Sequence, residues 1–485
     1  MGMIAPAGLA SVTSSSKAAW TSAPTTVLSA TIAPRSACGR SLAAPACRCA
    51  AIACDCTDDA RGALMNQMDE TFDPIGPHFL SYRQQDGTQV TDEIMWRLRA
   101  AGVLVWRDAA DLSPGDTETR LEEALADGLA GGILVITEDV ANSRIVRELE
   151  APRLIELAAH SSFGLAIAND VVAWGEPDYG APDRLLGRDD GKLAGFVQDS
   201  VASPDGMRQL VERVRRLRVR NLRERVAACD GWLRLSVQTR NSGASVDRTG
   251  AALDLRVRPA RSGRLPDATG LRYFADSAPG IADAVIDAGA SKVRLSGGAH
   301  LSVALALGVL LPTTRIGRIE VLDQYDQTWS AGAPAFGAEP DLLHVAEEHI
   351  TGADDARAVA VYLDLMPMPN DGAWLALLDQ VPTPFAAAVH VRPAADGMLD
   401  PGRGAALAGT AAAVVRELTY RHAGAEAHIV YRGPFGLAPL IGRLLNTVRG
   451  VLYEWDDTGE SARYVPTLRT SPADQSRPVE TLLHD

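Results

Sequence analysis

Three short motifs in the first half of the chain place one carboxylate, Glu148, where it can do chemistry. They occupy residues 78–83 (His-Phe-Leu-Ser-Tyr-Arg), 106–108 (Trp-Arg-Asp) and 143–149 (Ser-Arg-Ile-Val-Arg-Glu-Leu). Beside the mouth of a sheet, a carboxylate can stabilise a positively charged, oxocarbenium-like carbon or attack it as a nucleophile. The alternative is that Glu148 is an ordinary solvated residue on an amphipathic helix.

Alternating strand and helix patterns must position these motifs. Short apolar runs predict strands at 78–82, 103–106, 132–137 and 163–168, and helical periodicity predicts helices at 89–100, 117–129 and 143–159. Strands that alternate with helices of this length indicate βαβ units and one parallel sheet. Ligands bind such open sheets at the carboxyl ends of the strands, which is where Tyr82 and Trp106 fall.

A last helix in this half begins at Ser203-Pro204 and has an arginine-dense face. We expect it to be a solvated connection to the second half, with anion binding as the alternative. The arginines concerned are Arg213, Arg215, Arg216, Arg218 and Arg220.

Residues 75–222 resemble a TIR domain, a flavodoxin-like parallel-sheet fold. The resemblance rests on an ordered set of runs at 79–83, 102–108, 111–116, 133–137 and 143–149. TIR domains are either scaffolds for protein assembly or enzymes that break the nicotinamide–ribose bond of NAD+. The resemblance implies that Glu148 is the catalytic glutamate. It also implies a set of substrate contacts, namely Ser81, Tyr82, Arg83, Trp106, Asp108 and Asp111.

Some of these residues have a second interpretation. Ser81 is alternatively a turn residue at a strand end, and Trp106 is alternatively part of the core. Many enzymatic relatives carry an aromatic residue shortly before the glutamate, where this chain has Ile145. An aromatic ring that stacks on nicotinamide would then come from elsewhere, including a neighbouring subunit.

The second half of the chain contains an internal repeat. Val-Arg-Pro at 257–259 recurs at 391–393, and the same separation relates Gly308 to Gly442 and Glu320 to Glu454. Around each glycine the pattern predicts a strand, a glycine-containing loop, a helix and a further strand. We therefore expect two Rossmann-like halves, at about 229–340 and 355–470, related by a pseudo-twofold axis.

Residues 229–485 resemble a SAVED domain, the duplicated Rossmann-like (CARF-like) sensor of bacterial cyclic-oligonucleotide antiphage signalling (CBASS). The resemblance rests on the runs at 296–308, 432–442 and 453–455. Two facing strand–turn–helix units suit a ring of several phosphates, because helix N-termini offer free N–H groups. The expected ligand-binding residues are Gly297, Gly298, His300, Ser302, Asn370, Arg432, Gly433, Pro434 and Phe435.

Two of these residues have a stated role: Arg432 is expected to pair with phosphate, and Phe435 to stack on a base. The alternative is that the glycines only form tight turns and that Phe435 belongs to the core.

The composition argues against several other functions. A net charge of −14 argues against a nucleic-acid polymer as partner, and no apolar run is long enough to span a membrane. No phosphate-loop lysine motif or Gly-x-Ser-x-Gly motif is present. His344 and His349 are too far apart for a His-Glu-x-x-His zinc site, so we expect an exposed helix face there.

Five of the six cysteines lie in the first 56 residues, in spacings that miss the usual zinc patterns. We therefore expect no metal, and a cysteine-poor folded part that suits the cytoplasm. Residues 1–64 are rich in Ala, Ser, Thr and Pro and contain no acidic residue before Asp55. Such a segment is typical of a transit peptide or of sequence upstream of a true start at Met65 or Met68, and the bacterial resemblance favours the second. We expect it to be disordered.

Together the two resemblances predict a cytoplasmic antiphage effector. A cyclic oligonucleotide, expected to be cyclic tri-adenylate, binds the sensor, drives head-to-tail self-association into filaments and activates cleavage of NAD+ to nicotinamide and ADP-ribose. No cofactor is expected, because NAD+ is the substrate. The competing hypotheses are a non-catalytic TIR scaffold and a sensor that hydrolyses its own ligand.

Overall fold

The computed structural model describes residues 72–107, 124, 127–188, 190–240, 250–260, 264–331, 341–350, 357–380, 385–459 and 461–484. The predicted disordered segment 1–64 and most of the predicted helix 117–129 lie outside the described residues.

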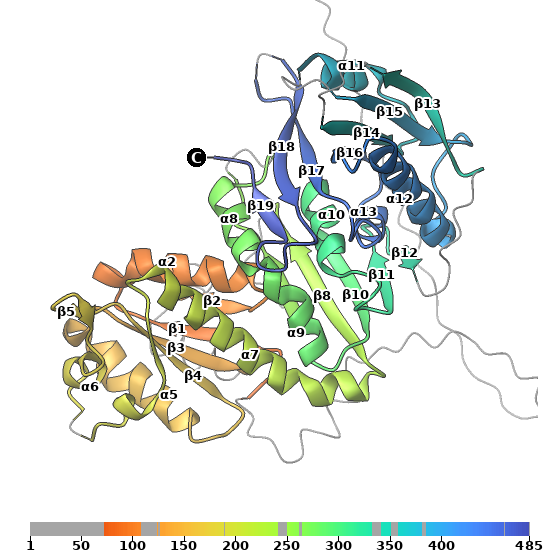
Figure 1. Cartoon of the computed structure of the whole chain (residues 1–485). Helices are drawn as coiled ribbons and strands as arrows, with labels where there is room; N and C mark the ends of the chain where they lie inside the picture. The colour runs from red at the N-terminus through yellow and green to blue at the C-terminus, as the bar shows by residue number, and fades with distance from the viewer. Residues whose placement is uncertain are drawn as a thin grey trace, which may run out of the picture. The chain divides into compact units, whose positions relative to one another are not determined.

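Five parallel strands form the sheet of the first half, in the order β2-β1-β3-β4-β7 (Figure 1). This is the flavodoxin-like order, in which the chain reverses direction across the sheet between its first and third strands. The predicted fold class is therefore confirmed for this half. The strands are β1 (His78–Ser81), β2 (Val105–Arg107), β3 (Gly131–Ile136), β4 (Gly164–Asn169) and β7 (Gln198–Ser200).

Helices cover both faces of this sheet. On one face, α2 (Gln84–Ala100) and α7 (Pro204–Ala228) bury residues such as Leu98 and Leu210. On the other face, the π-helical turn η2 (Val146–Glu150) continues into α5 (Ala151–Leu157), which buries Leu154. Short elements complete this half: η1 (Val140–Asn142), β5 (Val172–Ala173), β6 (Glu176–Pro177), α6 (Ala181–Leu185) and η3 (Leu193–Gly195).

The next sheet follows the same plan, in the order β12-β11-β10-β8-β9, with β12 antiparallel to its neighbour. Its strands are β8 (Trp232–Gln238), β9 (Leu253–Arg256), β10 (Lys292–Gly298), β11 (Arg318–Leu322) and β12 (Thr328–Ala331). The helices are α8 (Ala268–Ser277), η4 (Ala278–Gly280), α9 (Ile281–Asp287) and α10 (Leu301–Leu310).

The last sheet contains the order β18-β17-β16-β14-β15, with one further strand at each edge, β13 and β19. Its strands are β13 (Leu343–Ile350), β14 (Ala358–Asp364), β15 (Ala387–Pro393), β16 (Glu426–Arg432), β17 (Gly450–Asp456), β18 (Arg463–Thr470) and β19 (Val479–Thr481). The helices are α11 (Asp371–Gln380), η5 (Pro401–Arg403), α12 (Gly404–Arg421) and α13 (Leu437–Gly442).

The two sheets confirm the predicted duplication. Strand by strand, β12-β11-β10-β8-β9 corresponds to β18-β17-β16-β14-β15, with the same parallel and antiparallel neighbours. The separation seen in the repeated tripeptide also relates β10 to β16 along their whole lengths. The edge strands β13 and β19 lie outside the expected limits of the two halves, 229–340 and 355–470.

The repeat glycines explain how the two halves meet. A Cβ atom on Gly308 of α10 would lie 2.3 Å from the carbonyl oxygen of Pro439, and one on Gly442 of α13 would lie 2.1 Å from that of Leu305. Leu305 and Pro439 are themselves related by the repeat, so the contact is symmetric. Only a residue without a side chain permits this approach of the two helices. Apart from Leu301, every residue of α10 is buried, as expected of a helix that is apolar on all sides.

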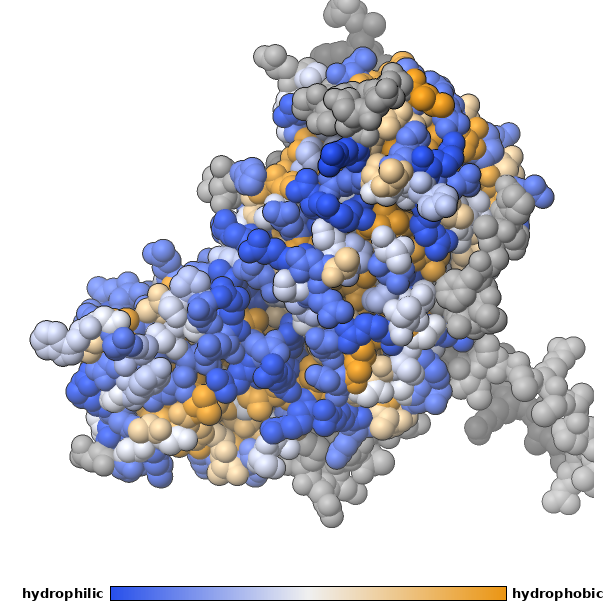
Figure 2. Space-filling model, viewed as in Figure 1, coloured by the Kyte–Doolittle hydropathy of each residue, from blue (hydrophilic) through white to orange (hydrophobic). Residues whose placement is uncertain are grey.

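Charged and polar residues cover most of the face of the molecule shown in Figure 2, with apolar side chains scattered between them. The apolar residues of the second and third sheets instead gather mainly in one large core cluster, which includes Val293, Leu305, Val361 and Leu440, and a smaller cluster around Tyr362 and Trp374 covers the other face of the last sheet. Among the described helices, none is both long and apolar enough to cross a lipid bilayer.

Candidate functional site

The switch point of the first sheet lies between the carboxyl ends of β1 and β3. Ser81 ends β1 and is fully buried, and Thr137 follows β3 and is 5% exposed. In an open α/β sheet the crevice at such a switch point is where ligands bind. The structure therefore places the predicted residue Ser81 at the position where this fold puts a site.

The carboxylate that lies beside Ser81 is Glu150, which the sequence did not single out. The Ser81 hydroxyl donates a hydrogen bond of 2.6 Å to Oε2 of Glu150, and Glu150 is only 4% exposed. Glu150 is the last residue of the π-helical turn η2. The only sign of it in the sequence is a second carboxylate two positions after Glu148.

Glu148, the predicted catalytic glutamate, faces solvent. Its side chain is 48% exposed and is paired with Arg144 (Nε to Oε2, 2.8 Å) and Arg147 (Nη2 to Oε1, 3.4 Å). The hydrogen bond from Arg144 lowers the pKa of the Glu148 carboxyl, with a further contribution from Arg147. The structure does not bring Glu148 together with the residues at the end of β1.

The other predicted NAD+ contacts occupy different environments. Arg83 donates to Asp86 at 2.8 Å and lies 3.7 Å from Asp139, so its charge is balanced by neighbouring acids. Tyr82 and Trp106 are each 6% exposed and pack in the two core clusters on opposite faces of the sheet. For Trp106 this burial favours the alternative of core packing. Asp108 and Asp111 lie outside the described residues.

In the last sheet, Arg432 and Asn370 meet at a buried acid, Asp364. Nη1 of Arg432 donates to Oδ1 of Asp364 at 2.5 Å and to the carbonyl of Met368 at 2.7 Å. The backbone N–H of Asn370 donates to Oδ2 of Asp364 at 2.7 Å. Asp364 and Arg432 end β14 and β16, which flank the switch point of this sheet.

Asp364 is the centre of a larger polar network. It is 1% exposed and also lies 3.4 Å from Nε2 of the buried His390. Burial opposes ionisation of Asp364, but the hydrogen bonds from His390, Asn370 and Arg432 outweigh it and lower the pKa of the carboxyl. His390 in turn lies against the rings of Tyr362 and Trp374, with centroid distances of 4.8 and 5.4 Å. The only sign of this network in the sequence is Asp364, a single acid at the end of the apolar strand β14.

The matching switch point in the other half contains His300 and Ser302. The hydroxyl of Thr239 lies 2.7 Å from both the backbone nitrogen and Nδ1 of His300. The backbone N–H of Ser302, at the start of α10, donates to Oε1 of Glu454 at 2.6 Å. Burial raises the pKa of Glu454, although hydrogen bonds from Ser302 oppose this. A carboxylate from the second half therefore occupies one N–H group of the predicted phosphate site.

The glycines of the predicted ligand loops also have structural roles, apart from any contact with a ligand. Gly297 has a φ of +117°, and a Cβ atom there would lie 2.2 Å from the carbonyl of Val237. Gly298 accepts a backbone hydrogen bond from Thr239. In the second loop, a Cβ on Gly433 would meet the ring of Tyr431, whose hydroxyl donates to the carbonyl of Pro434 at 2.7 Å. Phe435 is partly buried against the large core cluster, which favours the packing alternative for this residue.

The predicted arginine face on α7 is only partly a surface. Arg215 and Arg218 are buried, which corrects the expectation that both were solvated. Arg218 donates to the carbonyls of Ile75, Gly76 and Ala252, at 2.9, 2.7 and 2.8 Å, so each of its three guanidinium nitrogens makes a hydrogen bond inside the protein. Burial lowers its pKa to about 10, which still leaves it charged at neutral pH.

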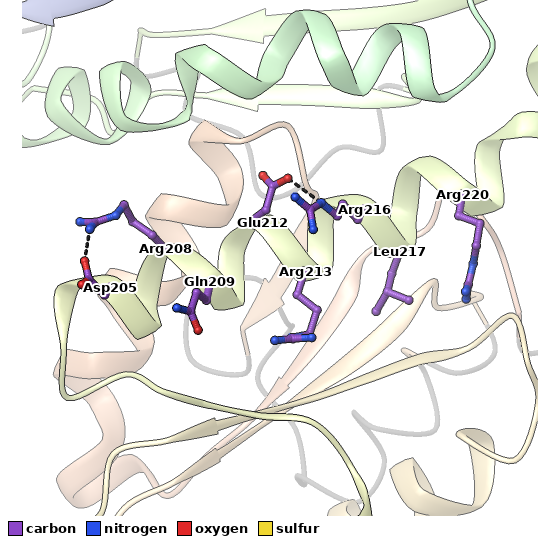
Figure 3. A pocket seen from close by; sticks show the side chains of 8 residues that line it. All are labelled: Asp205, Arg208, Gln209, Glu212, Arg213, Arg216, Leu217 and Arg220. Atoms are coloured by element: carbon purple, nitrogen blue, oxygen red, sulfur yellow. Dashed lines mark hydrogen bonds and ion pairs between the residues drawn. The ribbon is translucent and has the colours of Figure 1, made fainter. Parts of the chain in front are cut away.

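The remaining side of α7 lines an open cleft of about 770 Å³ (Figure 3). Three of its arginines pair with acids: Arg208 with Asp205, Arg216 with Glu212 at 2.8 Å, and Arg213 with Asp199 at 2.9 Å. The fourth, Arg220, donates to the carbonyl of Ser161 at 3.5 Å. Since three of the four charges are balanced by acids, the cleft gives little support to the alternative of anion binding. Within the part of the chain that the structure describes, no cluster of His, Cys, Asp and Glu has the makings of a metal site.

Comparison with known protein families divides the chain in the same way. Residues 79–161 match the TIR domain family, and residues 278–469 match the family described as the SMODS-associated and fused to various effectors sensor domain, SAVED. No curated protein matches the chain.

Solved structures similar to the chain include two SAVED/CARF-domain containing receptors. The Cap4 receptor of Acinetobacter baumannii, determined with the cyclic trinucleotide 2'3'3'-cAAA, is 13% identical, with a TM-score of 0.40 over 79% of this chain and 97% of that one. The Cap4 receptor of Moraxella osloensis is also 13% identical, with a TM-score of 0.36 over 79% and 98% of the two chains. These likenesses are too distant to assign a ligand. The two family matches identify the domains. The chain combines a TIR domain with a SAVED sensor domain.

Proposed function

We propose that this protein is an antiphage effector in which a cyclic oligonucleotide bound to the SAVED domain activates cleavage of NAD+ by the TIR domain. The observation that carries the proposal is the presence of both domains in one chain, a sensor joined to a domain that has a carboxylate at its switch point. The activator is expected to be a cyclic trinucleotide of adenine.

The reaction needs little beyond a well-placed carboxylate. The bond between C1′ of the ribose and the nicotinamide nitrogen breaks, and its electron pair neutralises the positively charged ring. Nicotinamide therefore leaves without a general acid. The ribose carbon becomes oxocarbenium-like and is stabilised or trapped by the carboxylate, until water adds to give ADP-ribose and a proton.

The sensor residues proposed to hold the ligand come from both halves. Arg432, whose side chain is 31% exposed, presents a guanidinium fixed by Asp364 and suited to a phosphate. Asn370 lies at the same switch point. At the other switch point, the N-terminus of α10 with His300 and Ser302 offers N–H groups, provided that Glu454 yields its place.

A second candidate function is a non-catalytic assembly module, and one observation favours it. Ile145 and Leu149, one helical turn apart, are 37% and 36% exposed. Glu148 beside them forms ion pairs with two arginines. Such a surface suits contact with another TIR domain. Head-to-tail association of ligand-bound chains into filaments is compatible with either function, since heterologous contacts form open assemblies when they do not close.

The test is nicotinamide release by the full-length protein, alone and with a panel of cyclic di-, tri- and tetranucleotides. The proposal expects release only with one panel member, and expects cyclic tri-adenylate to be that member. Ligand binding and assembly without any release of nicotinamide would favour the scaffold function. Loss of the added oligonucleotide itself would instead favour a sensor that degrades its ligand.

A further inference from the structure

We infer that Glu150, rather than Glu148, is the carboxylate that acts on the ribose carbon of NAD+. The inference rests on the proposed function and names the residue responsible. One face of the helical segment 143–150 meets the sheet, and that face determines which carboxylate points inward. The sequence motif alone does not show which face it is.

The segment 143–150 has one buried face. Val146 and Glu150 are 1% and 4% exposed, whereas Ile145, Glu148 and Leu149 are all at least one-third exposed. Residues two positions apart point to nearly opposite sides of either an α-helix or a wider π-helical turn, which agrees with the exposure of Glu148 and the burial of Glu150. When Glu150 faces the sheet, Glu148 must face away from it.

The π-helical geometry explains why spacing along the sequence does not show which carboxylate faces the sheet. The turn η2 (Val146–Glu150) is wider than an α-helical turn and accommodates one extra residue. Downstream of Ser143, whose hydroxyl accepts a hydrogen bond from the N–H of Val146 at 3.3 Å, this extra residue shifts the face each position presents. Spacing from the serine therefore does not identify the inward carboxylate. Turns of this kind occur frequently at functional sites.

The surroundings of Glu150 suit the chemistry better than those of Glu148. The 2.6 Å distance between Ser81 Oγ and Glu150 Oε2 is typical of a hydroxyl that donates to an ionised carboxylate. Removed from water, a negative charge stabilises a developing positive charge strongly, because the local dielectric constant is low. Glu148 is 48% exposed and has two guanidinium groups within 3.4 Å, which balance its charge.

Ser81 is a positioning residue for Glu150. It ends β1 at the switch point with β3, so its hydroxyl fixes Glu150 at the carboxyl edge of the sheet where the nicotinamide–ribose bond would lie. Its role is to hold the orientation and ionisation of Glu150 and does not require contact with the substrate.

The experiment compares Glu150→Gln with Glu148→Gln in the full-length protein, measuring nicotinamide release with the activating oligonucleotide at saturation. We expect Glu150→Gln to lose at least about 100-fold in rate, as expected when an electrostatic group is removed from a transition state. Glu148→Gln tests the competing assignment and should stay within about threefold. Glu156→Gln is the matched control, because Glu156 is another exposed acid that pairs with an arginine on the following helix. The reverse order would overturn the assignment. Absence of release by the unmodified protein with every oligonucleotide would instead overturn the proposed function.

A second measurement does not depend on the folding of Glu150→Gln. Ser81→Ala removes a hydrogen bond to the ionised form of Glu150 and so should raise its pKa, which moves the acid limb of the pH–rate profile to higher pH. An acid limb that stays in place in Ser81→Ala but moves in Arg144→Ala would assign the reaction to Glu148.

Discussion

Among the single residues proposed to bind the ligand, Arg432 gives the most direct test. Its guanidinium is oriented by Asp364 and by the carbonyl of Met368, yet part of it stays accessible. A phosphate that approaches a pre-oriented arginine gains charge-assisted hydrogen bonds at little entropic cost. Asp364 is thus a positioning residue for Arg432.

Replacing Arg432 by alanine should weaken binding of the activating oligonucleotide by about 10- to 100-fold, because one charge-assisted hydrogen-bonding group is lost. Arg449→Ala is a suitable control, since Arg449 is 65% exposed and pairs only at 3.5 Å with Glu426 in the same domain. Binding measured by calorimetry should separate the two variants. Equal affinities would show that the phosphate site lies elsewhere in the sensor.

At the scale of elements, the symmetric contact between α10 and α13 is what joins the two halves of the sensor. Gly308→Ala or Gly442→Ala forces a methyl group against a backbone carbonyl, so each should lower the free energy of unfolding by about 1–3 kcal/mol. Gly317→Ala provides the comparison, because a Cβ there would be 3.5 Å from the nearest atom, an ordinary contact. Denaturant unfolding curves test this. Unchanged stability in both glycine variants would mean that the helices can move apart freely.

The elements also show what the sequence could predict. Apolar runs and the repeated Val-Arg-Pro tripeptide were sufficient for the parallel sheets and for the duplication, because buried strands and repeated packing contacts leave strong periodic signals. The segment 344–349 was expected to be a helix face but belongs to β13, an edge strand paired with β15. Its mostly polar residues carry no clear period, and only pairing with a distant strand determines their structure.

The candidate site was predictable only in part for the same reason. Ser81 and Arg432 fall at strand ends, which sequence patterns locate well. The choice between Glu148 and Glu150 depends on the π-helical turn, and the position of Asp364 beside Arg432 depends on how two strands align. Neither is a local property of the sequence. The burial of Arg215 and Arg218 could not be predicted, because carbonyl groups of distant segments accept hydrogen bonds from both side chains, although Arg215 also pairs with Glu212 on its own helix.

At the scale of the whole molecule, two buried histidines should make the fold sensitive to acid. Burial lowers the pKa of His78 to about 3, with help from Arg218, and burial lowers that of His428 to about 4. An unfolded histidine takes up a proton near pH 6.5, whereas these two remain neutral in the folded protein. Each therefore contributes stability above pH 6.5 that is lost as the pH falls toward the folded pKa, by about 1.4 kcal/mol per pH unit.

Melting temperatures recorded between pH 7.5 and pH 5 test this prediction. The melting temperature of the native protein should fall as the pH decreases, and His428→Gln should fall less steeply because one of the two proton-linked groups is gone. His344→Gln, at an exposed position, is the control and should keep the native slope. A slope for His428→Gln equal to that of the control would show that His428 takes up its proton at the same pH in the folded and unfolded states.

The central claim is that occupancy of the sensor controls NAD+ cleavage by the same chain. The most direct measurement titrates cyclic tri-adenylate into the full-length protein at fixed NAD+ and follows bound ligand and released nicotinamide in the same samples. If occupancy controls cleavage, no nicotinamide is released without ligand, and the rate of release rises in step with occupancy. Release that is independent of the ligand, or saturated binding with no release, would contradict it.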